Sequence, residues 1–88
     1  MTDAEKIKEY AACLMSIPDI AVLMGVDVDS LRGKIADRSS AISIAYYQGK
    51  AETTLAIRRQ EVELAKAGSP LAVERTSDYL VEQSQHEL

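Results

Sequence analysis

Few side chains in this 88-residue sequence are of types that catalyse reactions or hold metal ions. Its only histidine, His86, lies near the end of the chain, and its only cysteine, Cys13, has no basic neighbour within a helical turn. A histidine base needs a group to act with, and a reactive thiolate needs nearby positive charge. We therefore expect no catalytic residue, no metal and no cofactor, and the chain is not expected to be an enzyme.

A pair of aspartates, Asp27 and Asp29, resembles the opening of a calcium-binding loop. In such a loop a glycine follows at the sixth position and a bidentate glutamate at the twelfth. Here the glycine, Gly33, comes one position late, and Arg38 stands where the glutamate should be. The spacing therefore excludes an EF-hand type of calcium site.

Composition limits the remaining functions. The chain carries 10 Lys and Arg against 14 Asp and Glu, a net charge of −4, and has four Tyr but no Trp or Phe. A non-specific nucleic-acid binder or a basic membrane-surface peptide needs an excess of cations. No apolar run approaches the roughly 18 residues of a membrane span, and the start lacks the apolar centre of a signal peptide. We expect a cytoplasmic protein without a membrane partner.

Capping residues and apolar spacing predict an all-α fold. Thr2 and Glu5 form a capping box that starts a first helix, which should run to about Ser16. Pro18 suits the first turn of a second helix from 19 to 24, and Asp27 can cap a third through Ile35. A long helix is expected from 41 to 67, where Gly68 ends it, and a last helix is expected from 70 to 83. The implied organisation is a three-helix region 1–38, a helical hairpin 39–83 and a flexible tail 84–88.

The second and third predicted helices have the spacing of a helix-turn-helix. That motif needs a small residue in its first helix and a turn residue with positive φ four positions later, which Ala21 and Gly25 provide. Apolar residues that would fill the crossing are Ile20, Met24, Val26, Leu31 and Ile35. The same spacing can also arise by chance in a three-helix bundle, so the motif indicates a fold before it indicates a function.

In a DNA-binding helix-turn-helix, the second helix enters the major groove. The candidate DNA-binding residues on and after that helix are Val28, Asp29, Arg32, Lys34 and Arg38. The cations among them could contact phosphates, but they could equally form an ordinary solvated surface. Asp27 and Asp29 would repel phosphate, so any affinity for double-stranded DNA should depend on several copies of the chain.

The long helix is apolar on two sides. One stripe contains Ile44, Tyr47, Ala51, Leu55, Val62 and Ala65, and the other contains Ile42, Ala45, Tyr46, Gly49, Ile57 and Leu64. A small bundle can cover only one stripe, so the other should face a second subunit. The expected homo-oligomer interface is formed by Tyr46, Gly49, Ala51, Leu55 and Ile57. Arg58 and Arg59 could face DNA or an acidic partner, but pairing with Glu61 and Glu63 within the helix is the favoured interpretation.

The order of these features resembles the small subunit of phage terminases and related phage helix-turn-helix proteins. The resemblance covers residues 17 to 80 and rests on the segments IAVLMGVDVDSLRGKI, AYYQGKAETTLAIRR and ELAKAGSPLAVERTSDYL. It implies a ring-forming protein that recognises the viral packaging site and hands the DNA to a large ATPase-nuclease subunit. It also implies a location in the host cytoplasm, DNA contacts around Arg32 and subunit contacts along the long helix.

Two other functions fit the same residues. A transcriptional regulator would use the helix-turn-helix as a dimer on two half-sites about one helical turn of DNA apart. A helical assembly protein would have kept the motif as architecture and lost DNA binding, as the acidic balance suggests. The number of subunits in the assembly separates a ring from a dimer.

Overall fold

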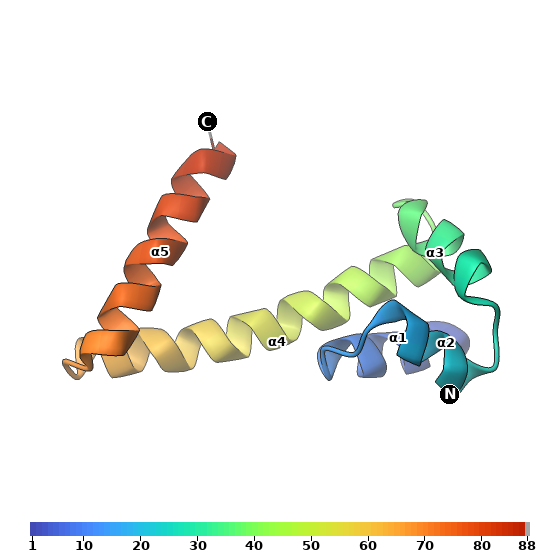
Figure 1. The fold of residues 1–88 in the computed structure, drawn as a ribbon, viewed down its shortest axis with the longest axis horizontal. Coiled ribbons are helices and arrows are strands. Elements are labelled where there is room, and N and C mark those ends of the chain that lie inside the picture. Colours follow the sequence, from blue (N-terminus) through green and yellow to red (C-terminus); the bar gives the residue numbers. More distant parts are fainter. Residues whose placement is uncertain (88) are drawn as a thin grey trace. The chain divides into compact units, whose positions relative to one another are not determined.

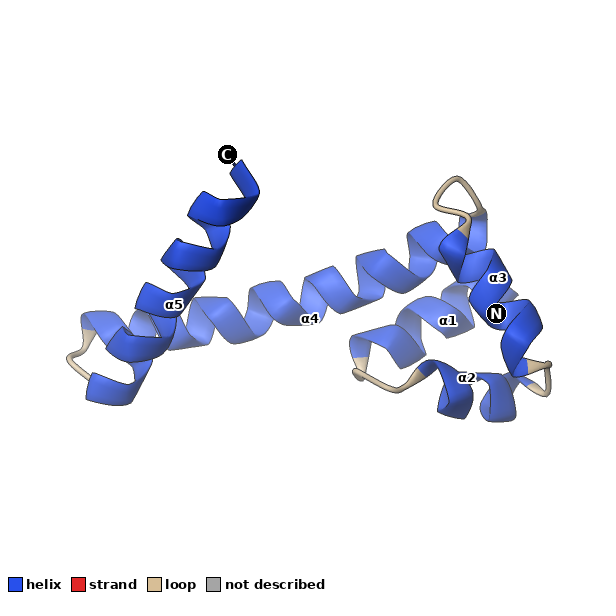
Figure 2. Ribbon diagram, turned by 45° about the horizontal axis from the view of Figure 1, so that its top comes forward, coloured by secondary structure: helices blue, strands red, loops and turns tan. Residues whose placement is uncertain are grey.

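The computed structural model describes residues 1–87, and this part of the chain is all-helical, without a strand (Figures 1 and 2). Five helices follow one another through short connections: α1 (Asp3–Ala12), α2 (Ile17–Met24), α3 (Val28–Ala36), α4 (Ala41–Lys66) and α5 (Pro70–Glu87). The predicted all-α class is confirmed, and so is a long helix followed by a C-terminal one. Leu88 lies outside the described residues.

Side-chain caps explain where the first three helices start. The Thr2 hydroxyl accepts a hydrogen bond from the Glu5 backbone N–H at 3.2 Å, and an Asp27 carboxylate oxygen accepts one from Ser30 at 3.0 Å. Both caps were expected from the sequence. Ser16 caps α2 in the same way, so this helix begins at Ile17 rather than at Asp19. Each cap satisfies a backbone donor that the first helical turn leaves unpaired.

Helix ends differ more from the sequence-based expectation. Helix α1 stops at Ala12, four residues before the expected end, and Leu14 has a left-handed backbone with φ of 60°. Helix α5 continues to Glu87, so the predicted tail 84–88 is helical as far as it is described. Gly25 has φ of 68° at the end of α2, as the turn of the predicted motif requires.

The contacts divide the chain into an N-terminal unit, Met1–Thr54, and a C-terminal unit, Leu55–Leu88. The predicted boundary after residue 38 is therefore wrong, because the first half of α4 belongs with α1, α2 and α3. Each unit is described by itself below.

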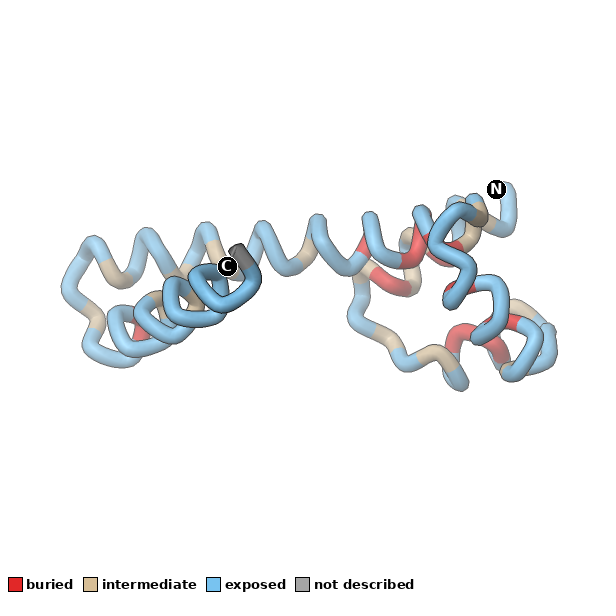
Figure 3. Tube along the Cα trace, turned by 90° about the horizontal axis from the view of Figure 1, so that it is seen from above, coloured by how far each residue is buried: buried red, intermediate tan, exposed pale blue. Residues whose placement is uncertain are grey.

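The N-terminal unit has a compact apolar core. Figure 3 shows the buried stretches of α1, α2, α3 and the start of α4. The core cluster contains Ile7, Ala11, Ile20, Ala21, Leu31, Ile35, Ala45 and Tyr46. Three of these, Ile20, Leu31 and Ile35, were expected to fill the helix-turn-helix crossing, and Ala21 is the small residue of that motif. Met24 is half-buried against the cluster as expected, whereas Val26 is exposed, so its predicted place in the crossing is wrong.

Helix α4 lies directly against the backbone of α1. Gly49 is buried, and a Cβ atom at this position would overlap the Lys8 carbonyl oxygen and come within 3.1 Å of the Ala12 nitrogen. One turn further on, the Thr53 hydroxyl donates a hydrogen bond to the Ala12 carbonyl. Lys8 and Glu52 form an ion pair at 3.2 Å beside this contact. A glycine is thus required for the close approach of the two helices.

Two serines join the end of α3 to the start of α4. The Ser43 hydroxyl, fully buried, donates to the Ile35 carbonyl at 2.6 Å. Ser40 donates to the Lys34 carbonyl at 2.6 Å and accepts from the Ser43 N–H at 3.0 Å. These bonds satisfy carbonyls that the last turn of α3 leaves unpaired, and they fix α3 relative to α4.

The Gly49 contact predicts a large asymmetry between two glycine substitutions. Gly49→Ala should lower the free energy of unfolding by about 1–3 kcal/mol, because backbone atoms must move to admit the new methyl group. Gly33→Ala is the matched control: no atom lies within 4 Å of its added Cβ, and it should stabilise the protein by roughly 0.5–1 kcal/mol. Urea unfolding followed by circular dichroism measures both. An unfolding midpoint for Gly49→Ala at or above that of the wild type would refute the α1–α4 packing.

Candidate functional site

Helix α3 presents a polar face to solvent from the N-terminal unit. Leu31 and Ile35 hold its inner side in the core, while Asp29, Arg32 and Gly33 are exposed. This agrees with the inner and outer faces expected from the sequence. Val28 is the exception, because it is half-buried and packs against the core cluster. Its assignment as a DNA-contacting residue is therefore corrected to a packing role.

The three candidate cations do not gather at one point. Arg32 and Lys34 are two positions apart, which places them about 200° apart around the helix axis. Lys34 lines a small hollow together with Asp3 and Ile42, on the side of α3 that faces α1 and α4. Arg32 is thus the one candidate cation on the opposite flank of α3.

Arg38 lies beyond the end of α3 and stacks on an aromatic side chain. Its guanidinium carbon is 3.7 Å from the centre of the Tyr47 ring, and the Tyr47 ring meets Tyr46 edge to face at 5.1 Å. Lys50 lies over the Tyr46 ring at 5.2 Å. The cation–π contact orients Arg38 while leaving it exposed, so its N–H groups remain able to reach a phosphate.

Acidic residues outnumber basic ones in the N-terminal unit. The N-terminal unit carries six Lys and Arg against eight Asp and Glu. Asp27 is fixed at the start of α3 by its capping bond to Ser30, whereas Asp29 is exposed and forms no ion pair within residues 1–87. A single unit therefore has a mixed, locally unfavourable potential toward DNA.

The first half of one α4 stripe is buried inside the N-terminal unit, where a subunit interface was expected. Tyr46 and Gly49 are buried within the N-terminal unit, so their assignment to a subunit interface is corrected. Ala51, Leu55 and Ile57 are exposed, and their place in an interface stays a prediction. The close approach expected at Gly49 exists, but its partner is α1 of the same chain and not a second subunit. The signal was the run of small residues at the end of α1, which allows a glycine of another helix to come close.

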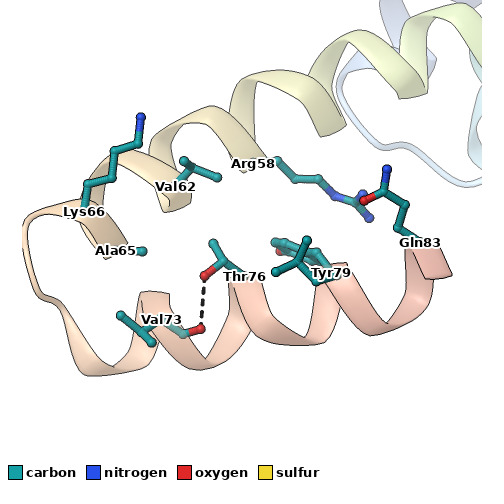
Figure 4. A pocket seen from close by; sticks show the side chains of 9 residues that line it. Arg58, Val62, Ala65, Lys66, Val73, Thr76, Tyr79 and Gln83 are labelled. Carbon is teal, nitrogen blue, oxygen red and sulfur yellow. Dashed lines mark hydrogen bonds between the residues drawn. The ribbon is translucent and has the colours of Figure 1, made fainter.

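An apolar groove between the two helices of the C-terminal unit was missed by the sequence reasoning. It has a volume of about 680 Å³, and Figure 4 shows the side chains of α4 and α5 that line it. Its lining consists of Arg58, Val62, Ala65, Lys66, Val73, Thr76, Tyr79, Leu80 and Gln83.

A polar cluster joins α4 to α5 beside this groove. Glu61, with a side chain only 14% exposed, pairs with Arg75 at 3.5 Å and hydrogen-bonds to Tyr79. Arg58 stacks on the Tyr79 ring at 4.3 Å and pairs with Glu82 at 3.7 Å. Arg58 and Glu61 thus bind partners on α5, and the expectation that they pair within α4 is wrong. The hydrogen bond to Glu61, followed by desolvation and the Glu61 charge, raises the pKa of Tyr79 above its ordinary value of 10.0.

The raised pKa of Tyr79 predicts a distinct tyrosine in an alkaline titration. Because the folded-state pKa lies above the unfolded one, the Tyr79 contribution to stability is complete below pH 10 and is lost as the pH rises through the folded value. Absorbance at 295 nm should show a late step from a tyrosine that ionises above pH 10, and Tyr79→Phe should remove that step. Tyr10→Phe is the control and should leave it in place. Loss of the late step in Tyr10→Phe instead would contradict the Glu61–Tyr79 bond.

Neither a metal centre nor a membrane span is found in the part of the chain that the structure describes. No group of three or more His, Cys, Asp or Glu side chains there is arranged to hold a metal ion. No described helix combines the length and the apolar character needed to cross a bilayer. No protein-family model, curated protein or solved structure matches the chain.

Proposed function

We propose that this protein is a non-enzymatic DNA-recognition subunit that works as a homo-oligomer, in the manner of the small subunit of a phage packaging terminase. The observation that carries the proposal is the arrangement of α2, the Gly25 turn and α3. The inner side of α3 packs in the core, and its outer side exposes Arg32 to solvent. The resemblance of the sequence segments supports the packaging role. A large ATPase-nuclease subunit would then be its protein partner.

Helix α3 is held in place at both ends and along its inner side, as a helix that enters the major groove would need to be. Its N-terminus is capped by Asp27, its inner residues are in the core, and its C-terminal carbonyls are bound by Ser40 and Ser43. A recognition helix held in this way loses little conformational freedom on binding. Arg32 supplies the long, multidentate side chain that base edges and phosphates accept.

Several copies bound to one DNA molecule would compensate for the weak DNA affinity of a single copy. A single unit with net negative charge gains little from counterion release, which supplies most non-specific DNA affinity. When linked copies bind one DNA molecule, the second contact forms at high effective concentration, and the overall affinity can rise by two or more orders of magnitude. Self-association is therefore part of the proposed function.

The acidic outer face supports a second candidate, a helical assembly protein without DNA binding. Asp27 and Asp29 both lie at the start of α3, where an approaching phosphate backbone would meet them first. Under this alternative the helix-turn-helix serves only to build the N-terminal unit. Direct binding measurements separate the two functions.

The test is a fluorescence-anisotropy titration of duplex DNA at several salt concentrations. Arg32→Ala should weaken binding and lower the slope of log affinity against log salt by about 1 for each subunit in contact. Asp29→Asn should strengthen binding, because it removes a negative charge that has no ion-pair partner. Lys6→Ala, an exposed cation on α1, is the matched control for loss of one positive charge.

Two results would decide against DNA recognition by α3. The first is the absence of binding by the wild-type protein even at low salt, which would leave the assembly function. The second is an equal loss of affinity in Arg32→Ala and Lys6→Ala, since this would indicate a general charge effect.

A further inference from the structure

Two cations of the N-terminal unit lie on aromatic rings at the start of α4. Arg38 lies over the Tyr47 ring and Lys50 over the Tyr46 ring, and the two rings meet edge to face. Tyr47 and Lys50 are three residues apart on α4, so their side chains are neighbours on one helix surface. Both cations are exposed. Arg38, Tyr47 and Lys50 therefore form one continuous surface, the cationic patch.

The cationic patch keeps its positive charge in a unit that is acidic overall. Neither Arg38 nor Lys50 forms an ion pair in the described part of the chain. Residues 38–51 are the longest stretch of the sequence without an Asp or Glu. Asp37, just before this stretch, accepts hydrogen bonds from the Ser39 N–H at 3.2 Å and the Ser39 hydroxyl at 2.7 Å. Two cations thus stand against one carboxylate that already has hydrogen-bond partners.

The structure holds the cationic patch in a fixed position next to the end of α3. Arg38 is the second residue after that helix. Ser43, one helical turn before Tyr47 on α4, donates its hydroxyl hydrogen to the Ile35 carbonyl of α3. The Tyr47 ring orients the Arg38 guanidinium, whose outward N–H groups stay accessible. The patch and the proposed recognition helix therefore belong to one rigid surface.

We propose that the cationic patch binds the phosphate backbone of the same duplex DNA whose major groove receives α3. A phosphodiester strand is a row of negative charges, and it complements cations that carboxylates leave unpaired. A helix in the major groove has a phosphate strand on either side, and residues at the C-terminal end of a homeodomain's recognition helix contact that strand. Arg38 and Lys50 bind phosphate oxygens, and Tyr47 positions Arg38.

This inference rests on the proposed function and adds a contact without sequence preference. Phosphate contacts set the orientation and register of a protein on DNA but do not read bases. The two ends of α3 differ in charge, since Asp27 and Asp29 lie at its start and the cationic patch follows its end. An approaching phosphate strand is therefore repelled at the first end and attracted at the second. The sequence reasoning named Arg38 for DNA but missed Tyr47 and Lys50.

The experiment is an anisotropy titration of the full chain with fluorescent duplex DNA between about 50 and 200 mM salt. Arg38→Gln and Lys50→Gln should each reduce the slope of log affinity against log salt by about 0.9 per subunit in contact, and together by about twice that. The reduction should be equal on duplexes of unrelated sequence. Lys6→Gln, which removes an exposed cation of α1, is the matched control and should leave the slope unchanged.

A charge-conserving protein separates a phosphate contact from a structural role. Arg38→Lys combined with Lys50→Arg keeps both positive charges and should keep the wild-type slope. Circular dichroism should show the wild-type unfolding midpoint for every variant, because both side chains are exposed. A slope reduced as much in the charge-conserving protein as in the glutamine variants would overturn the proposal.

The remaining outcomes distinguish this inference from the proposed function. Wild-type slopes in both glutamine variants, or a reduction no larger than that of Lys6→Gln, would overturn the inference, whereas recognition by α3 would stand if Arg32→Ala still weakens binding. Reduced slopes in the patch variants, with no effect of Arg32→Ala, would support the patch and count against α3. A wild-type protein that binds no DNA at low salt would overturn both proposals.

Discussion

The contact of Gly49 with the α1 backbone determines how the rest of the N-terminal unit is arranged. It brings the first half of α4 against α1 and allows Thr53 and Glu52 to bind Ala12 and Lys8. Because α4 is held in this way, Ser43 can bind the end of α3 from a fixed position. The orientation of the proposed recognition helix therefore depends on a glycine 13 residues after that helix has ended.

The two units are stabilised by different interactions. The N-terminal unit has a continuous apolar core to which four helices contribute. In the C-terminal unit, ion pairs, one tyrosine hydrogen bond and a cation–π contact join the helices, and most large apolar residues remain exposed. Exposed ion pairs contribute little stability, so the contacts between α4 and α5 hold this unit more weakly than the core holds the N-terminal unit.

Local signals in the sequence predicted most of the helices, and longer-range contacts account for the errors. The caps at Thr2 and Asp27 and the turn at Gly25 depend on neighbouring residues, so their sequence is sufficient evidence for them. Which side of α4 is covered depends on α1, more than 30 residues earlier in the chain, and periodicity alone does not identify the partner of a helix face. The same reason explains the missed groove and the partners of Arg58 and Glu61, since all of them join separate helices.

Asp27 limits how the outer face of α3 can change during evolution. Its carboxylate caps the helix, so replacement by a cation would remove the cap and cost on the order of 1 kcal/mol. Asparagine or serine would retain the cap and only neutralise the charge. Position 33 has open space and a helical backbone, so it accepts a side chain without collision. A positive charge on this face is therefore more accessible through a lysine or arginine at position 33 than through charge reversal at the helix start.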